Sequence, residues 1–199
     1  FSIRFNVEIT SPSVPYYLSA SKTKALASLE TKVAGLVLVD AKAFYRDASS
    51  GILNAGTLPP KVNQPTDYTV HWLIKNYSTD VKTVEVRAFL QPNVEWAGIV
   101  KSNLDSVPLY NEMTREVVWA LDKISATKGV LSDPIEAVFQ IKATPQSSHI
   151  GQYQPLLSET NLVAIDEFTG LELISSDVAQ TTLLPDDVTV GQDGGRVTP

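Results

Sequence analysis

Two histidines, His71 and His149, are the side chains best suited to acid–base chemistry or zinc binding in this 199-residue sequence. Either role needs convergent partners: further ligands for zinc, or a nucleophile and an orienting group for catalysis. His71 lies in opposite phase to Trp72 along an alternating segment, which predicts an exposed or sheet-surface position. His149 lies in a loop rich in turn formers. We predict no catalytic residue here; a pocket gathering one histidine with two carboxylates would reopen that question.

Other chemical motifs are incomplete. No Gly-x-Ser-x-Gly elbow surrounds a serine, and no phosphate-binding glycine loop is present. The absence of cysteine excludes disulfides, thiolate metal sites and cysteine nucleophiles. Five acidic residues could offer oxygen ligands to calcium but lack the spacing of a calcium loop, so we expect them in solvated loops: Asp166, Glu167, Asp186, Asp187 and Asp193. We therefore expect no metal, no cofactor and no enzymatic activity.

The single N-glycosylation sequon is Asn76-Tyr77-Ser78. It opens a polar turn, so Asn76 is the candidate site for a glycan. Lys75 and Asn76 are also the residue types that form intramolecular isopeptide links in some surface domains. That chemistry needs both side chains buried beside a carboxyl group, whereas the alternation predicts that Lys75 points outward.

The three tryptophans, Trp72, Trp96 and Trp119, all lie on alternating segments beside aliphatic residues. They could form an aromatic platform for sugar rings or pack in a sandwich core. Aromatic residues in strand phase usually point inward, which favours the core. A carbohydrate-binding module would instead need exposed aromatic side chains, for which the candidates are Tyr16, Tyr17, Tyr110 and Tyr153.

The segment that must position most of these residues runs from Thr66 to Lys75. Prolines precede it and a polar turn follows, which is typical of a strand and its boundaries. Every second residue in it is large and apolar, as expected for a half-buried strand of a β-sandwich: Tyr68, Val70, Trp72 and Ile74.

Similar alternation predicts further strands at residues 1–10, 83–90, 117–121 and 137–143, and a final hairpin or strand pair at residues 162–168 and 171–174. Residues 22–33 are ambiguous, because Leu26, Leu29 and Val33 have helical spacing. Their counterpart later in the chain is richer in β-branched and aromatic residues, which favours a strand. A short helix or irregular segment over residues 22–30 remains the alternative.

An internal repeat supports this comparison. The segment FNVEIT at residues 5–10 parallels FQIKAT 134 positions later, and AGLVL at residues 34–38 parallels TGLEL 135 positions later. We interpret residues 1–50 as the closing half of one repeat, completed by upstream chain or a neighbouring subunit. Residues 51–185 then form one whole repeat, and residues 186–199 a linker or tail.

Composition limits the partners. The 16 Lys and Arg against 22 Asp and Glu give a net charge of −6, and no basic stripe could follow a phosphate backbone, so we expect no nucleic-acid binding. The longest apolar run, Leu36-Val37-Leu38-Val39, is too short to span a bilayer, so we expect no membrane insertion.

A series of short motifs suggests a family. In chain order they are Leu58-Pro59-Pro60-Lys61-Val62, Tyr68-Thr69-Val70-His71-Trp72, Pro92-Asn93-Val94-Glu95-Trp96, Arg115-Glu116-Val117-Val118-Trp119 and Asp166-Glu167-Phe168-Thr169-Gly170. The series resembles the tandem Ig-like conserved-repeat modules, a domain of unknown function, of prokaryotic cell-wall, S-layer and extracellular-matrix proteins. The match covers about residues 52–185, and the first 50 residues resemble its final strands. The motifs are structural rather than catalytic.

The resemblance implies an all-β chain in which one complete Ig-like β-sandwich follows a partial one. The function that it implies is that of a secreted, prokaryotic structural building block of a cell-surface layer, stalk or filament. Its partners would be copies of itself or neighbouring repeats, joined by β-strand addition. The candidate edge for strand exchange is Ile3, Phe5, Val7 and Ile9. The alternative is a carbohydrate-binding or adhesive module with a glycan as partner.

Overall fold

The computed structural model describes residues 1–10, 24–191 and 193–199. The chain divides into two compact units, Phe1–Ala34 and Gly35–Pro199. This boundary differs from the one expected near residue 50. The reason is that Val37–Phe44 forms a strand, β3, whose whole length pairs with strand β4 of the second unit.

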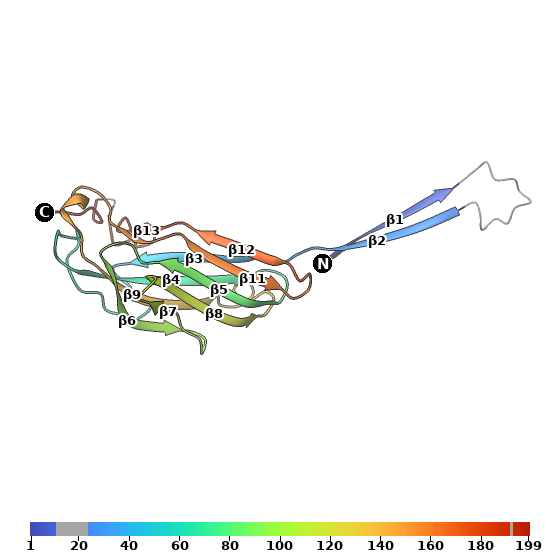
Figure 1. Ribbon diagram of the computed structural model, residues 1–199, viewed down its shortest axis with the longest axis horizontal. Coiled ribbons are helices and arrows are strands. Elements are labelled where there is room, and N and C mark those ends of the chain that lie inside the picture. The colour runs from blue at the N-terminus through green and yellow to red at the C-terminus, as the bar shows by residue number, and fades with distance from the viewer. Residues whose placement is uncertain (11–23, 192) are drawn as a thin grey trace, which may run out of the picture. The chain divides into compact units, whose positions relative to one another are not determined.

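The second unit is an antiparallel β-sandwich (Figure 1). One sheet has the strand order β3-β4-β9-β6, the other the order β12-β11-β5-β8-β7, and β10 pairs with β13. The strands and one 3₁₀ turn are β3 (Val37–Phe44), β4 (Thr66–Asn76), β5 (Val81–Phe89), β6 (Val94–Ser102), β7 (Leu109–Asn111), β8 (Glu116–Ile124), β9 (Ile135–Ala143), η2 (Ser147–His149), β10 (Pro155–Leu157), β11 (Thr160–Asp166), β12 (Glu172–Asp177) and β13 (Gln180–Thr181). The all-β sandwich expected from the sequence is confirmed. Within the described residues, no helix is long and apolar enough to cross a bilayer.

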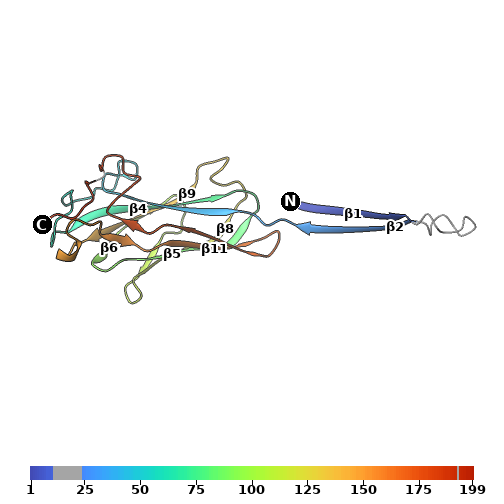
Figure 2. The same cartoon turned by 90° about the horizontal axis from the view of Figure 1, so that it is seen from above.

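Strand β4 lies in the middle of the four-stranded sheet, between β3 and β9 (Figure 2). Its inward residues Tyr68, Val70, Trp72 and Ile74 are fully buried, as the alternation predicts. Trp72 stands opposite Ala41 on β3 and Ala137 on β9, so two small side chains make room for the indole. Burying large apolar side chains of this kind contributes about 1.5–3 kcal/mol each.

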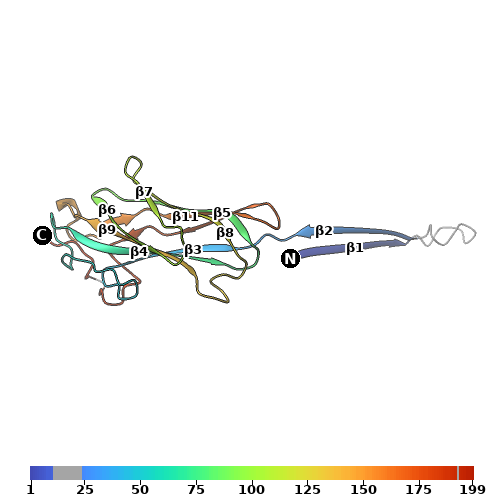
Figure 3. The same cartoon turned by 90° about the horizontal axis from the view of Figure 1, so that it is seen from below.

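The core interpretation of the tryptophans is confirmed for Trp72 and Trp119, which have no exposed surface. Trp119 lies on β8 opposite Val86 of β5. Strands β5 and β8 are neighbours in the second sheet (Figure 3). Trp96, on β6, is only partly buried and packs against the core from its margin. The two sheets thus meet around two wholly enclosed indoles.

The C-terminal residues of the second unit, expected to be a linker or tail, pack onto the sandwich instead. Val197 is buried, and the Thr198 amide donates to the Pro60 carbonyl at 2.8 Å. Gly195 approaches the backbone so closely that a Cβ there would lie 1.6 Å from the Thr182 carbonyl oxygen. Glycine is therefore the residue that permits this closure.

The first unit is a two-stranded antiparallel hairpin of β1 (Ser2–Thr10) and β2 (Lys24–Lys32). The strand interpretation of the ambiguous segment is confirmed over residues 24–32, and the helical alternative is wrong there. Residues 22 and 23 lie outside the described residues. All residues of both strands are exposed.

The hairpin is strongly two-faced. One face carries only apolar side chains and Thr31: Ile3, Phe5, Val7 and Ile9 from β1 stand opposite Thr31, Leu29, Ala27 and Ala25 from β2. The other face carries most of the charges, including the ion pairs Arg4–Glu30 at 2.8 Å and Glu8–Lys24 at 2.7 Å. Because every residue of both strands is exposed, this unit has no core of its own. An isolated two-stranded hairpin of this kind is marginally stable in water at best.

Candidate functional site

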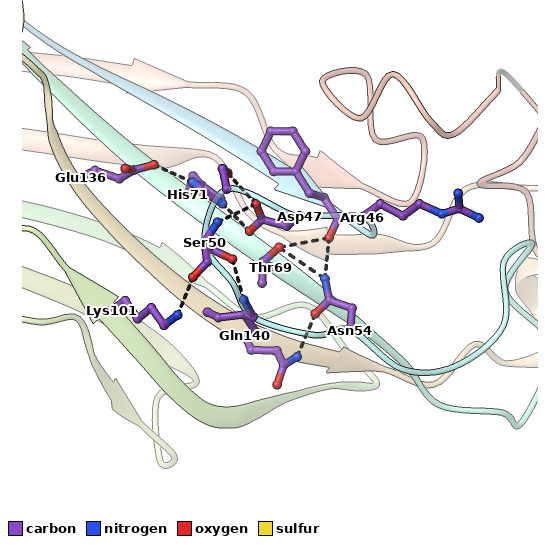
Figure 4. Close-up of polar contacts among 12 residues, drawn as sticks. Arg46, Asp47, Ser50, Asn54, Thr69, His71, Lys101, Glu136 and Gln140 are labelled. Atoms are coloured by element: carbon purple, nitrogen blue, oxygen red, sulfur yellow. Dashed lines mark hydrogen bonds and ion pairs between the residues drawn. The ribbon is translucent and has the colours of Figure 1, made fainter.

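The histidine that sequence reasoning placed on an exposed surface, His71, is buried at the outer side of β4 (Figure 4). Its Nδ1 lies 2.6 Å from Glu136 Oε1, and its Nε2 lies 2.7 Å from Asp47 Oδ2. The prediction of exposure is wrong because the loop after β3, which carries Asp47, folds over this face of the sheet. The Phe44 ring packs edge-on against the imidazole, with centroids 5.1 Å apart. We call His71, Asp47 and Glu136 the histidine clasp.

Asp47 is tightly bound within the clasp. Its Oδ1 accepts a hydrogen bond from the Ser49 hydroxyl at 2.7 Å and from the Ser50 amide at 3.2 Å. Burial raises the pKa of Asp47, but the hydrogen bonds from Ser50, His71 and Ser49 outweigh it and hold the pKa below its ordinary value. Asp47 therefore stays ionised at neutral pH.

The histidine clasp brings one histidine together with two carboxylates, the arrangement named above as a reason to consider catalysis again. Both carboxylates can accept a hydrogen bond from the ring at the same time only when both ring nitrogens carry a hydrogen. Neither nitrogen is then free to act as a base toward a nucleophile. The nearby Ser49 hydroxyl donates to Asp47, not to His71. The arrangement can hold charge and fix a loop, but it lacks the nucleophile–base contact of a hydrolase.

Amide side chains fasten the same loop further along. The Asn54 amide donates to the carbonyls of Phe44 at 3.2 Å and Tyr45 at 3.0 Å. Gln140, on β9, donates to the Leu53 carbonyl at 3.0 Å and to Asn54 Oδ1 at 2.8 Å. Together with the clasp, these contacts bury β4 and β9 on both faces.

Two of the five acidic residues considered as calcium ligands, Asp166 and Asp187, hold backbone amides instead. Asp166 is buried, and its carboxylate accepts from the Gly35 amide at 2.7 Å and the Phe168 amide at 2.8 Å. Asp187 is also buried and accepts from the amides of Tyr45 at 2.9 Å and Arg46 at 2.8 Å. For both, burial raises the pKa and these hydrogen bonds more than offset it, so each pKa is lowered. The expectation of solvated loops is wrong for these two.

Of the remaining three, Asp193 pairs with Arg196 at 3.0 Å, and Glu167 pairs with Lys123 at 2.7 Å. Burial raises the pKa of Asp186, with Asp40 and Asp177 adding to the effect and Lys42 opposing it. Among the residues that the structure describes, no group of three or more His, Cys, Asp or Glu side chains is arranged to hold a metal ion.

Asn76 does not present its side chain for glycosylation. It is fully buried, and its amide nitrogen donates to the carbonyls of Thr79 at 2.7 Å, Ile124 at 3.2 Å and Ser125 at 3.1 Å. The atom that would carry a glycan thus holds the turn after β4 against the end of β8. The sequon indicates a turn, as expected, but a structural one.

The tyrosines proposed for sugar binding are dispersed. Tyr16 and Tyr17 lie outside the described residues. Tyr153 lies under the Arg196 guanidinium, 4.7 Å from its ring centroid. Tyr110 stacks on Trp96, with centroids 5.5 Å apart and planes 12° apart.

The Trp96–Tyr110 pair borders a hollow of about 330 Å³ that Glu95, Glu112 and Arg115 also line. The Arg115 guanidinium is occupied, because it donates to the carbonyls of Leu90, Gln91 and Val94. The hollow therefore offers an aromatic wall and two acidic side chains.

The four residues of the candidate strand-exchange edge, Ile3, Phe5, Val7 and Ile9, form the β1 half of the hairpin's apolar face. They are 48–64% exposed, and Leu29 opposite Phe5 is 65% exposed. One edge of β1 is already taken by β2. We call this surface, with Ala25, Ala27, Leu29 and Thr31, the hairpin face.

No protein-family model matches the sequence, and no curated protein matches it. Among solved structures, the chain is similar to the full-length major pilin SpaD from Corynebacterium diphtheriae, at 10% identity and a TM-score of 0.45 over 90% of this chain and 58% of that one. It is similar to BcpA, the major pilin subunit of Bacillus cereus, at 15% identity and a TM-score of 0.41 over 79% of this chain and 49% of that one.

A third similar structure contains three N-terminal domains of the type V pili tip protein Mfa5 from Porphyromonas gingivalis. The identity is 14% and the TM-score 0.37, over 54% of this chain and 22% of that one. The chain thus spans between 22% and 58% of the length of these three structures.

Proposed function

We propose that this chain is a non-catalytic structural module of a prokaryotic extracellular assembly, such as a surface layer, stalk or filament. In this proposal it associates with copies of itself or with neighbouring repeats through β-strand contacts made by its N-terminal hairpin. The observation that carries the proposal is the hairpin face, an apolar surface on a unit that has no core.

The energetics favour a partner for this face. Fully burying one Phe, Ile, Leu or Val side chain contributes about 1.5–3 kcal/mol, and the face holds five of them. An exposed apolar strand pair is otherwise an aggregation hazard, which natural proteins blunt with charges or cover. Here the charges lie on the opposite face, so the apolar face is left for contact.

The second unit suits a mechanical role. Its strands are joined by antiparallel hydrogen-bond ladders, and further hydrogen bonds fix both of its ends. At the N-terminal end the Gly35 amide donates to the Asp166 carboxylate, and at the C-terminal end the Thr198 amide donates to the Pro60 carbonyl. Backbone hydrogen bonds in such ladders share load along the strands. The histidine clasp in turn fixes the long loop between β3 and β4.

Electron microscopy of the concentrated chain tests the proposal. We expect filaments, lattices or other ordered assemblies from the unchanged protein, and dispersed particles from a Phe5→Asp/Leu29→Asp double variant. The matched control is Asn6→Asp/Ser28→Asp, which adds the same charge to the opposite face of the same hairpin. Equal assembly of both variants would refute a role for the hairpin face.

Glycan binding is a second candidate, supported by the hollow beside Trp96 and Tyr110. Aromatic rings stack on sugar faces while nearby carboxylates accept hydroxyl hydrogen bonds. We expect any glycan-array signal of the chain to fall at least about tenfold on Tyr110→Ala, a loss of about 1.4 kcal/mol. A signal that survives this change, or loss on Tyr153→Ala alone, would count against this site.

A further inference from the structure

We propose that β1 and β2 are the two closing strands of a separate sandwich, and that they part from each other to enter its two opposite sheets. The partner is an open segment of the same kind as residues 35–134 of this chain, with strands like β4, β5, β6 and β8 and no closing strands of its own. The inference rests on the neighbouring-repeat form of the proposed function and deepens it, because it names what covers the hairpin face.

The first strand matches β9 in sequence and in phase. Phe5 corresponds to Phe139, 134 positions later. At this spacing the apolar side of β1 falls on the inward side of β9, where all four side chains are buried: Ile3, Phe5, Val7 and Ile9 match Ala137, Phe139, Ile141 and Ala143. The apolar side of β1, which is exposed in the hairpin, thus corresponds to a side of β9 that forms part of the core.

The second strand matches β11 in the same way. Gly35 corresponds to Gly170, 135 positions later. At this spacing the apolar side of β2 falls on the fully buried side of β11: Ala25, Ala27, Leu29 and Thr31 match Thr160, Leu162, Ala164 and Asp166. Both strands therefore keep the inward phase of their copies.

The copies do not pair with each other. Strand β9 lies between β4 and β6 in one sheet, whereas β11 lies between β5 and β12 in the other. The pairing of β1 with β2 therefore has no equivalent in the finished sandwich. If β1 takes the place of a β9 and β2 the place of a β11, the two strands must separate.

The connection lengths agree with this separation. Thirteen residues separate Thr10 from Lys24, and sixteen separate Ala143 from Thr160. Hairpin loops usually need two to five residues, so both connections are long enough to cross from one sheet to the other. Their similar lengths are expected if they bridge the same gap.

The partner follows from what surrounds the copies. Phe139 packs against Trp72 and Trp96, with ring centroids 5.0 Å and 5.2 Å away, and Phe5 would take that place. The finished sandwich of a second molecule offers no such place, because its own β9 and β11 fill it.

The net charges of the two segments also differ in sign. Residues 1–34 contain four Lys and Arg against two Asp and Glu, a net charge of +2. Residues 35–134 contain ten Lys and Arg against eleven Asp and Glu, a net charge of −1. Their net charges are therefore complementary.

A chain extended with its own partner tests the inference. A copy of residues 35–134 is joined through a flexible linker to Phe1 of the full chain, which gives the two parts a high effective concentration. We expect amide hydrogen exchange in β1 and β2 to slow by at least about 100-fold relative to the unextended chain, because these amides enter a cooperative sheet. Phe5→Asp in the extended chain should abolish that protection. Exchange in β1 and β2 as fast as in the unextended chain would overturn the inference.

Separation of the strands is tested by a cross-link. Asn6 and Ser28 stand opposite each other in the hairpin, and the chain has no cysteine, so Asn6→Cys/Ser28→Cys gives one defined disulfide. In the extended chain, we expect protection of β1 and β2 only after reduction. Equal protection in the oxidised form would mean that the hairpin docks intact, which contradicts separation.

The two proposals fail separately. If the unextended chain assembles but the extended chain leaves β1 and β2 unprotected, the structural role stands and the partner is wrong. If the unextended chain stays monomeric but the extended chain closes, the partner is right and self-assembly is wrong.

Discussion

At the residue scale, His71 is the side chain whose role in this protein differs most from its expected one. Its alternation with Trp72 predicts a solvent-facing position, and the strand does place the two on opposite faces. The outward face is nevertheless buried, because the loop after β3, which carries Asp47, closes over it. Local periodicity shows which side of a strand a residue takes, but not what covers that side.

Removing the imidazole should leave Asp47 as an unpaired buried charge. We expect His71→Ala to lower the free energy of unfolding by about 3–5 kcal/mol, as measured by urea denaturation at pH 7. The control is Glu136→Gln at the exposed end of the clasp, where the carboxylate side chain is 38% exposed and the loss should be about 1 kcal/mol or less. A loss below about 1 kcal/mol for His71→Ala would show that the clasp contributes little.

Acid should weaken the protein through Asp47. Its hydrogen bonds hold its pKa below the ordinary value, so the folded state binds this proton less readily than the unfolded state does. The resulting stabilisation is complete above the ordinary aspartate pKa of about 4 and is lost as the pH falls toward the lower folded pKa. Asp166 and Asp187 act in the same direction.

We therefore expect the urea midpoint to fall steadily below about pH 4, and to fall less steeply in Asp47→Asn. The comparison of slopes, rather than of absolute stabilities, isolates the titration from the general loss of the carboxylate. An identical slope in the variant would assign the acid sensitivity to other groups.

At the element scale, the alternating segments predict the strands well, since period-two burial is a local property of sequence. The segment at residues 24–32 has helical spacing at Leu26 and Leu29, yet it forms β2. Its repeat counterpart, β11, resolves the ambiguity where propensity alone does not. The burial of Asn76 could not be foreseen, because two of the three carbonyls that it binds, those of Ile124 and Ser125, lie at or just after the end of β8, nearly fifty positions away.

The C-terminal closure offers a prediction with a matched control. A Cβ at Gly195 would collide with the Thr182 carbonyl, whereas a Cβ at Gly191 would meet nothing within 4 Å. We expect Gly195→Ala to lower the free energy of unfolding by about 2 kcal/mol or more, and Gly191→Ala to change it by less than about 0.5 kcal/mol. Similar thermal midpoints for the two variants would mean that residues 193–199 contribute little to the sandwich.

At the scale of the whole molecule, the fold class follows from the sequence, but the boundary between units does not. Residues 36–39 look like the continuation of the first repeat, since their counterparts follow Gly170. The chain instead places residues 37–39 at the start of β3, whose later residues Ala41 and Ala43 pair with β4 and help to close the core around Trp72. Partner choice between strands is non-local, so a repeat offset locates similar strands without telling which sheet each one joins.

The central claim is that the hairpin face is a contact surface for assembly. Sedimentation velocity over a wide concentration range tests it most directly, with the unchanged chain beside Phe5→Asp/Leu29→Asp and Asn6→Asp/Ser28→Asp. The account predicts that the weight-average sedimentation coefficient rises with concentration for the unchanged chain and for the polar-face variant, but not for the apolar-face variant. A chain that remains monomeric at the highest concentration and melts in one cooperative transition would contradict it.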